Sequence, residues 1–208
     1  MNYKIVIAST NKGKIKEINK ILNNIEHLKV DVGFLEHGQI PEPHEPYNTF
    51  MENAVHKAKY YAKHTKEATL SEDSGLCIEA LNGFPGVKSK DLVQECNGIL
   101  NAFIKVEQML SGTNNYRAYC QTSMAIYIPS TDVLITHEAK VHGSLSFPAK
   151  FNTNGVIEEA FGIDPIFVPE GYNQTFAELG IDIKNKISQR NKAISGVIEK
   201  LQVFLKNV

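Results

Sequence analysis

The chain has 208 residues, 42% of them apolar, and a formal net charge of −1. This length fits one large domain or two small lobes, and the nearly neutral charge gives no support for a nucleic-acid polymer as a partner. Three cysteines without metal or Cys-x-x-Cys spacing favour reduced thiols in a cytoplasmic protein, and no segment resembles a signal peptide or a membrane span, so we expect no membrane partner.

The first elements predict a strand, a polar turn and a helix. Residues 3–8 form a short apolar run that is typical of a central strand, and residues 9–11 (Ser-Thr-Asn) are good helix N-caps. This arrangement can present backbone N–H groups to a phosphate, and Lys12 and Lys14 add positive charge. Alone, the pattern also fits a capped surface helix with solvated lysines. The apolar face of the helix is predicted to carry Ile15, Ile18, Ile21 and Leu22.

The next segment combines a strand, a polar loop and a second helix. Residues 28–35 predict a strand, and the proline-rich loop 36–48, which includes Glu45, reads by itself as a mobile loop. Thr49 and Glu52 have capping-box spacing and predict the start of a helix. The core face of that helix is predicted to carry Ala54, Ala58, Tyr61 and Ala62.

A pair of adjacent carboxylates, Glu72 and Asp73, follows directly after the apolar segment 69–71. We interpret 69–71 as the end of a buried strand, with Ser74 and Gly75 turning the chain sharply. Adjacent carboxylates repel each other unless positive charge lies nearby, and a hard divalent cation, which takes oxygen ligands, meets that need. The alternative interpretation is a solvated acidic turn.

The second half predicts a helix, a long hairpin and a terminal helix. An apolar stripe indicates an amphipathic helix that ends at Gly112 and packs in the core; its residues are Leu100, Phe103, Ile104, Val106, Met109 and Leu110. Segments 116–128 and 133–141 alternate apolar and polar residues on either side of a turn, which indicates an antiparallel hairpin in a second lobe. Ser188 is a good N-cap for the last helix, which would place Gln189 and Arg190 in its first turn.

Several of these segments together resemble the Ham1/inosine triphosphatase family, from Ile5 to the last helix. The segment 72–89 is similar to the family's Asp/Glu-Asp-Ser-Gly-Leu…Gly-x-Pro-Gly-Val-x-Ser signature. The other matching motifs are Ser9-x-Asn11-x-x-Lys14, Thr49-Phe50-x-Glu52-Asn53-Ala54-x-x-Lys57-Ala58, Phe161-Gly162-Ile163-Asp164-Pro165-Ile166-Phe167 and Lys184-Asn185-x-x-Ser188-Gln189-Arg190.

The resemblance implies an α/β fold with a central mixed, twisted sheet, flanking helices and an active-site cleft between two lobes. It implies hydrolysis of non-canonical purine nucleoside triphosphates (ITP, dITP, XTP) to the monophosphate and pyrophosphate, which cleanses the nucleotide pool, and a homodimer. Asp73 would be the general base, and Mg²⁺ would be held by Glu45 and Asp73 with Glu72. The resemblance places the following residues at the substrate: Ser9, Thr10, Asn11, Lys12, Gly13, Lys14, Lys57, Ser74, Lys90, Phe161, Gly162, Ile163, Asp164, Lys184, Gln189 and Arg190.

The chain departs from the family pattern at the part that would bind the base. Ile163 stands where the family has an aromatic residue, Gln189 replaces its histidine, and the segment 149–160 lacks a glycine pair. These departures predict looser base selection. They also favour an alternative, a divergent nucleotide-binding protein without turnover, whereas the paired acids favour an enzyme. A Rossmann dehydrogenase is excluded because no glycine fingerprint follows the first strand.

Overall fold

The computed structural model describes residues 3–9, 12–22, 28–31, 40–151 and 162–206. Its strands form one six-stranded sheet in the order β2-β1-β3-β4-β5-β6. β1 pairs in parallel with both β2 and β3, and β5 pairs antiparallel with β6, so the expected mixed α/β sheet is confirmed. The strands are β1 (Tyr3–Ala8), β2 (Leu28–Asp31), β3 (Ala68–Ile78), β4 (Arg117–Ile128), β5 (Val133–Leu145) and β6 (Phe167–Pro169).

Seven helices that the structure describes are α1 (Lys12–Leu22), α3 (Phe50–Thr65), α4 (Ser89–Glu95), α5 (Ile99–Met109), α6 (Phe176–Leu179), α7 (Ile181–Ile187) and α8 (Gln189–Lys206). None of the helices in the described part of the chain is long and apolar enough to cross a membrane. The chain divides into two compact units, the first formed by residues 1–73, 122–139 and 190–208, and the second by 74–121 and 140–189.

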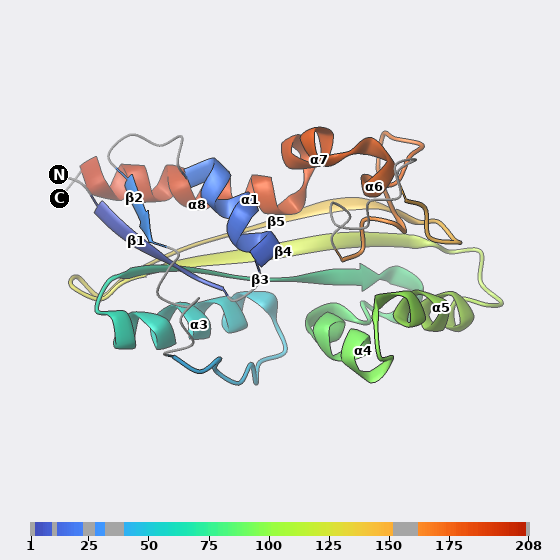
Figure 1. Ribbon diagram of the computed structural model, residues 1–208, viewed down its shortest axis with the longest axis horizontal. Helices are drawn as coiled ribbons and strands as arrows, with labels where there is room; N and C mark the ends of the chain where they lie inside the picture. The colour runs from blue at the N-terminus through green and yellow to red at the C-terminus, as the bar shows by residue number, and fades with distance from the viewer. Residues whose placement is uncertain (1–2, 10–11, 23–27, 32–39, 152–161, 207–208) are drawn as a thin grey trace. The chain divides into compact units, whose positions relative to one another are not determined.

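The first unit covers its part of the sheet with helices on both faces (Figure 1). Alternate residues of a strand point to opposite faces, and β1 shows this: Ile5 and Ile7 pack with α1 and α8, whereas Ala8 packs with Tyr61 of α3. Capping at Thr49 explains where α3 begins, because its hydroxyl accepts a hydrogen bond from the backbone N–H of Glu52. The predicted core face of α3 is confirmed by the burial of Ala54, Ala58, Tyr61 and Ala62.

The acidic pair lies inside a strand, which corrects the predicted strand end and turn. β3 continues without interruption from Ala68 to Ile78 and therefore includes Ser74 and Gly75. β4 lies beside β3 in the sheet, and pairing with a neighbouring strand overrides the turn preference of a Ser-Gly pair. β1 ends opposite Ser71, where Ala8 is its partner, so Glu72 and Asp73 lie just beyond the carboxyl end of β1.

The second unit has its own apolar core, formed by β-strand residues such as Leu76 and Phe167 with helical residues such as Phe103, Val106 and Phe176. Helix α5 begins and ends close to the predicted residues, but its predicted core stripe is partly wrong. Leu100 and Ile104 are 52% and 53% exposed. A helix has about 3.6 residues per turn, so a face that buries Ala102, Phe103 and Val106 turns Leu100 and Ile104 away from the core.

Three further segment predictions have clear outcomes. The second strand is shorter than expected, since β2 covers Leu28–Asp31 and the remaining residues, 32–35, lie outside the described part of the chain. The antiparallel hairpin is confirmed, because β4 and β5 are neighbours joined by only four residues, 129–132, a connection too short for parallel strands. Its predicted place in a second lobe is wrong for the turn and the adjoining residues, since 122–139 belong to the first unit and only the outer parts of β4 and β5 belong to the second. The last helix begins at Gln189 directly after Ser188, as predicted.

Candidate functional site

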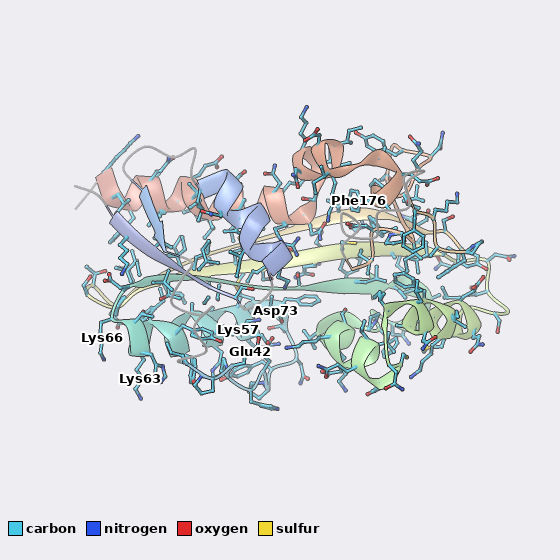
Figure 2. All side chains as sticks on the ribbon, in the orientation of Figure 1. Glu42, Lys57, Lys63, Lys66, Asp73 and Phe176 are labelled. Carbon is cyan, nitrogen blue, oxygen red and sulfur yellow. The ribbon has the colours of Figure 1, made fainter. Side chains whose placement is uncertain are left out.

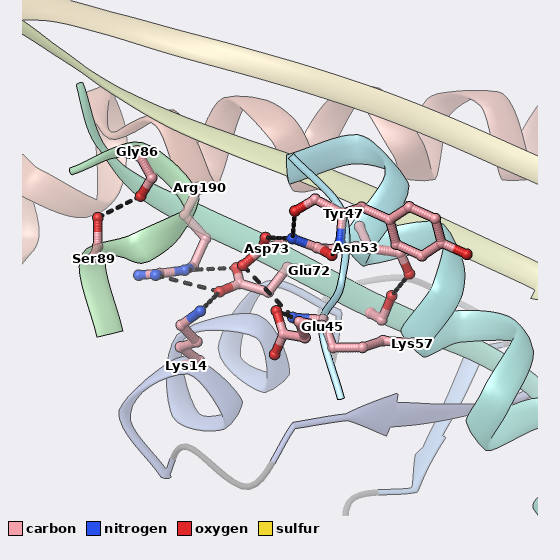
Figure 3. Close-up of polar contacts among 12 residues, drawn as sticks. Lys14, Glu45, Tyr47, Asn53, Lys57, Glu72, Asp73, Gly86, Ser89 and Arg190 are labelled. Carbon is pink, nitrogen blue, oxygen red and sulfur yellow. Dashed lines mark hydrogen bonds and ion pairs between the residues drawn. The ribbon is translucent and has the colours of Figure 1, made fainter. Parts of the chain in front are cut away.

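Strand β3 presents its two acidic residues to opposite faces of the sheet. Glu72 meets Lys14 of α1 and Arg190 of α8, whereas Asp73 meets Asn53 and Lys57 of α3 (Figure 3). The period-2 alternation of side chains in a strand produces this separation. All these residues belong to the first unit, which therefore carries two distinct polar clusters, one on each face.

The Glu72 cluster is a buried carboxylate held by two cations. The Lys14 ammonium lies 2.6 Å from Oε1 of Glu72, and Nε of Arg190 lies 2.8 Å from Oε2. The Glu72 side chain is only 1% exposed. Burial by itself raises the pKa of this carboxyl, but the Arg190 guanidinium and the Lys14 ammonium more than offset it and hold the pKa well below its usual range. Glu72 is therefore a carboxylate at neutral pH.

The Asp73 cluster has the opposite electrostatic balance. Nδ2 of Asn53 donates to Oδ2 of Asp73 at 3.1 Å (Figure 3). The Lys57 ammonium lies 3.6 Å from Oδ1 of Asp73, and both residues are labelled in Figure 2. Burial of Asp73 raises its pKa, and Glu45 adds to the rise, while Lys57, Lys14 and the hydrogen bond from Asn53 act against it. A carboxyl with a raised pKa accepts a proton more readily than an ordinary aspartate.

Lys57 also connects Asp73 to the loop that precedes α3. Its ammonium donates to Oε2 of Glu45 at 3.0 Å, so the carboxylates of Glu45 and Asp73 both contact one cationic group. The loop is fixed to α3 by Asn53, whose side chain accepts from the backbone N–H of Tyr47 at 3.1 Å and donates to its carbonyl at 3.2 Å. Glu45 is thereby held near Asp73 although it lies in an exposed loop.

Asn53 contacts both Asp73 and the Glu45 loop, although the sequence motifs do not assign it to the site. The available signal was its spacing from Lys57. Residues four apart in a helix lie on the same face, so a buried asparagine one turn before a candidate phosphate-binding lysine indicates a polar site beside the helix. Asn53 is 2% exposed.

The predicted three-carboxylate metal set does not converge. Glu45 and Asp73 lie together, whereas Glu72 faces the other side of β3 with its oxygens in ion pairs to Lys14 and Arg190. Among the described residues no group of three or more His, Cys, Asp or Glu side chains could hold a metal ion. Two carboxylates remain, and Mg²⁺ is commonly bound through one or two carboxylates together with substrate phosphates. Glu45 and Asp73 therefore fit this ion.

The second unit contains a buried ion pair among the predicted substrate residues. The Lys184 ammonium donates to Oδ2 of Asp164 at 2.7 Å, with the two side chains 7% and 4% exposed. Ile163, next to Asp164, is half-buried and packs against the apolar core of this unit. The side-chain carbonyl oxygen of Gln189 is buried and has no hydrogen-bond partner among the residues that the structure describes.

The remaining predicted residues differ in how far they can be placed. Ser9, Gly13 and Ser74 are half-buried, and Lys90 and Gly162 are exposed. Gly162 has a φ of 62°, which favours glycine. Thr10, Asn11 and Phe161 lie outside the described residues, and Lys12 is described only as the first residue of α1.

Comparisons with known proteins agree along nearly the whole chain. The Ham1 family model matches residues 5–200. A dITP/XTP pyrophosphatase of Zymomonas mobilis is 34% identical over 198 residues, which cover 94% of this chain and 90% of that protein. A dITP/XTP pyrophosphatase of Aquifex aeolicus is 34% identical over 211 residues, which cover 96% of each chain.

Solved structures give the same result. A Ham1 protein from Coxiella burnetii superposes with a TM-score of 0.80 at 30% identity and covers 99% of this chain and 100% of that one. The Staphylococcus aureus Ham1 protein has a TM-score of 0.79 at 28% identity, with 98% of both chains covered. With a family match from residue 5 to residue 200 and relatives 34% identical over nearly its whole length, this chain belongs to the Ham1 family.

Proposed function

We propose that this protein hydrolyses non-canonical purine nucleoside triphosphates, ITP, dITP and XTP, to the nucleoside monophosphate and pyrophosphate, and so cleanses the nucleotide pool. The observation that carries the proposal is the Asp73 cluster: a buried carboxyl of raised pKa lies within reach of a lysine and a second carboxylate. The relatives named dITP/XTP pyrophosphatase support the substrate class.

Asp73 is the general base in this proposal. A water attacks the α-phosphorus, one of its protons passes to the Asp73 carboxylate, and the bond from the α-phosphorus to the bridging oxygen breaks so that pyrophosphate leaves. The hydrogen bond from Asn53 at 3.1 Å fixes the orientation of the carboxylate, and burial supplies the raised pKa that makes it a stronger base.

Glu45 and Asp73 are the residues that would hold Mg²⁺. When bound, the ion would neutralise charge on the phosphate oxygens. Lys57, which contacts both carboxylates, is placed to exchange one of them for a substrate phosphate oxygen, because an ammonium has three donors that can be shared.

The triphosphate and the base are assigned to the remaining motif residues. The motif residues Ser9 to Lys14 would contact phosphate together with Lys57, Ser74 and Lys90. Phe161 would stack on the base, and Arg190 would contact its 6-keto oxygen. Gly162, Ile163, Asp164, Lys184 and Gln189 complete the nucleoside contacts that family membership suggests.

The test is a product assay with ITP, dITP, XTP, ATP and GTP in Mg²⁺. The expected result is stoichiometric pyrophosphate and monophosphate, with the keto purines preferred, and no activity after removal of the metal by a chelator. Release of orthophosphate would contradict the proposed cleavage. ITP binding by calorimetry without any product would instead favour the nucleotide-binding alternative.

Two further proposals rest on family membership. The protein acts in the cytoplasm, and it forms a homodimer. Sedimentation at micromolar concentration tests the second, since a single species of 23.2 kDa would contradict it.

A further inference from the structure

We infer that Glu72 is a positioning residue that holds Lys14 and Arg190 in place for the two ends of the substrate. The inference rests on the proposed function, in which Lys14 contacts the triphosphate and Arg190 contacts the base. Glu72 then has a role distinct from metal binding, which the proposed function gives to Glu45 and Asp73, and from proton transfer, which it gives to Asp73.

The geometry supports simultaneous contact with both cations. Lys14 lies 2.6 Å from Oε1 of Glu72, while Arg190 contacts both oxygens, through Nε at 2.8 Å and Nη2 at 3.4 Å. Because the guanidinium meets the carboxylate with two nitrogens, its plane as well as its position is fixed. A single carboxylate therefore determines where two residues, 176 positions apart in the chain, place their charges.

Burial of Glu72 keeps the side chains of Lys14 and Arg190 ordered. Glu72 is 1% exposed and Arg190 7%, whereas Lys14 is 19% exposed. A buried carboxylate cannot turn to solvent without its partners, so its cations stay ordered. Long cationic side chains lose conformational freedom when they bind a ligand. Because Glu72 already orders Lys14 and Arg190, these two side chains lose less conformational entropy when the nucleotide binds.

A purely structural role is the competing explanation, in which Glu72 only fastens α1 and α8 to β3. The two roles differ in what they change. A fastening role affects the melting temperature and the amount of active protein, leaving the kinetic constants of the folded fraction unchanged. A positioning role raises KM and reduces base discrimination, although Glu72 itself touches no substrate.

The experiment uses the full-length protein with Glu72→Gln, Arg190→Met, the double variant, and Glu67→Gln as a matched control. Glu67 also pairs with a lysine, Lys4 at 3.5 Å, but that pair is exposed. For Glu72→Gln we expect KM for ITP to rise roughly tenfold with kcat changed less than about threefold, and binding of inorganic tripolyphosphate to weaken by a similar factor. Glu67→Gln should match the wild type.

Base discrimination gives the second readout. The ratio of kcat/KM for ITP over ATP should fall in Glu72→Gln toward that of Arg190→Met, and the double variant should show no further loss, because both changes remove the same contact. Glu72→Asp keeps the charge but is one methylene shorter, so it cannot span both cations. It should show the same effects to a smaller degree, and it replaces Glu72→Gln if that variant does not fold.

The outcomes separate the two proposals. If the wild type does not hydrolyse ITP, the proposed function is wrong. If the wild type is active and a folded Glu72 variant has unchanged KM, tripolyphosphate binding and base discrimination, the proposed function stands and the positioning role of Glu72 is overturned.

Discussion

Glu72 and Asp73 are neighbours in the chain, yet Glu72 lies 2.8 Å from the guanidinium of Arg190 while Asp73 lies 3.1 Å from the amide of Asn53 on the other side of β3. Their electrostatic environments shift their pKa values in opposite directions, down for Glu72 and up for Asp73. Two carboxyls with such different environments are suited to different tasks.

Asp73→Asn is expected to lower kcat for ITP by at least roughly a hundredfold, the usual scale for losing a general base. Asparagine has nearly the same shape, so the melting temperature should change little. The measurement is pyrophosphate release at saturating ITP and Mg²⁺. Asp132→Asn is the matched control, because Asp132 accepts a hydrogen bond from the Tyr127 hydroxyl at an exposed position. Turnover by Asp73→Asn close to that of the control would remove Asp73 from the mechanism.

Tyr61 should make the stability of the protein depend on alkaline pH. Burial, with Glu42, Tyr60 and Glu45 adding to it, raises the pKa of Tyr61 to about 12. Because the folded state binds this proton more tightly than the unfolded state, the contribution is fully present below pH 10 and is lost as the pH rises toward 12. The free energy of unfolding should fall by about 2–3 kcal/mol over this window relative to Tyr61→Phe. A constant difference between the two proteins would contradict the prediction.

Gly196 is a helix residue for which alanine should be destabilising. Alanine usually stabilises a helix relative to glycine by about 1 kcal/mol, but a Cβ at this position would collide with the imidazole of His137. Gly196→Ala should therefore lower the free energy of unfolding by about 1–3 kcal/mol. In a His137→Ala background the same change should become stabilising, as urea titrations of the four proteins would show. A stabilising effect in both backgrounds would mean that His137 moves away without cost.

Local sequence patterns predict the strands and helices of the first unit. Contacts between residues far apart in the sequence determine which side chains come together in the candidate site. The N-cap at Thr49 and the burial of Ala54 and Ala58 follow from neighbouring residues, so the sequence alone was sufficient for them. The partners of Glu72 were not predictable in this way, because Arg190 is 118 positions further along the chain. Likewise, β3 continues through Ser74 and Gly75 because it pairs with the neighbouring strand β4, which local sequence does not reveal. For the same reason the structure does not bring Glu72 together with Glu45 and Asp73, because adjacent residues in a strand point to opposite faces.

Base selection is expected to depend on Gln189. A pocket that presents only donors at position 6 of the purine rejects ATP, because its amino group would meet another donor and both would be left unpaired at a cost of roughly 1–3 kcal/mol. An arginine is always a donor, whereas a glutamine amide has both a donor and an acceptor and can present either. The carbonyl oxygen of Gln189 is buried without a hydrogen-bond partner among the described residues, so an acceptor is available to a 6-amino group.

Gln189→His should therefore widen the ratio of kcat/KM for ITP over ATP, since a histidine held as a donor accepts nothing from the 6-amino group. Ile163, which is half-buried in the apolar core of the second unit, is the matched control, because Ile163→Tyr restores the family's aromatic residue without changing the donors. That variant should lower KM for ITP and ATP alike and leave the ratio unchanged. If Gln189→His leaves the ratio unchanged or lowers it, Gln189 does not read position 6, and the base contact must be assigned to another residue.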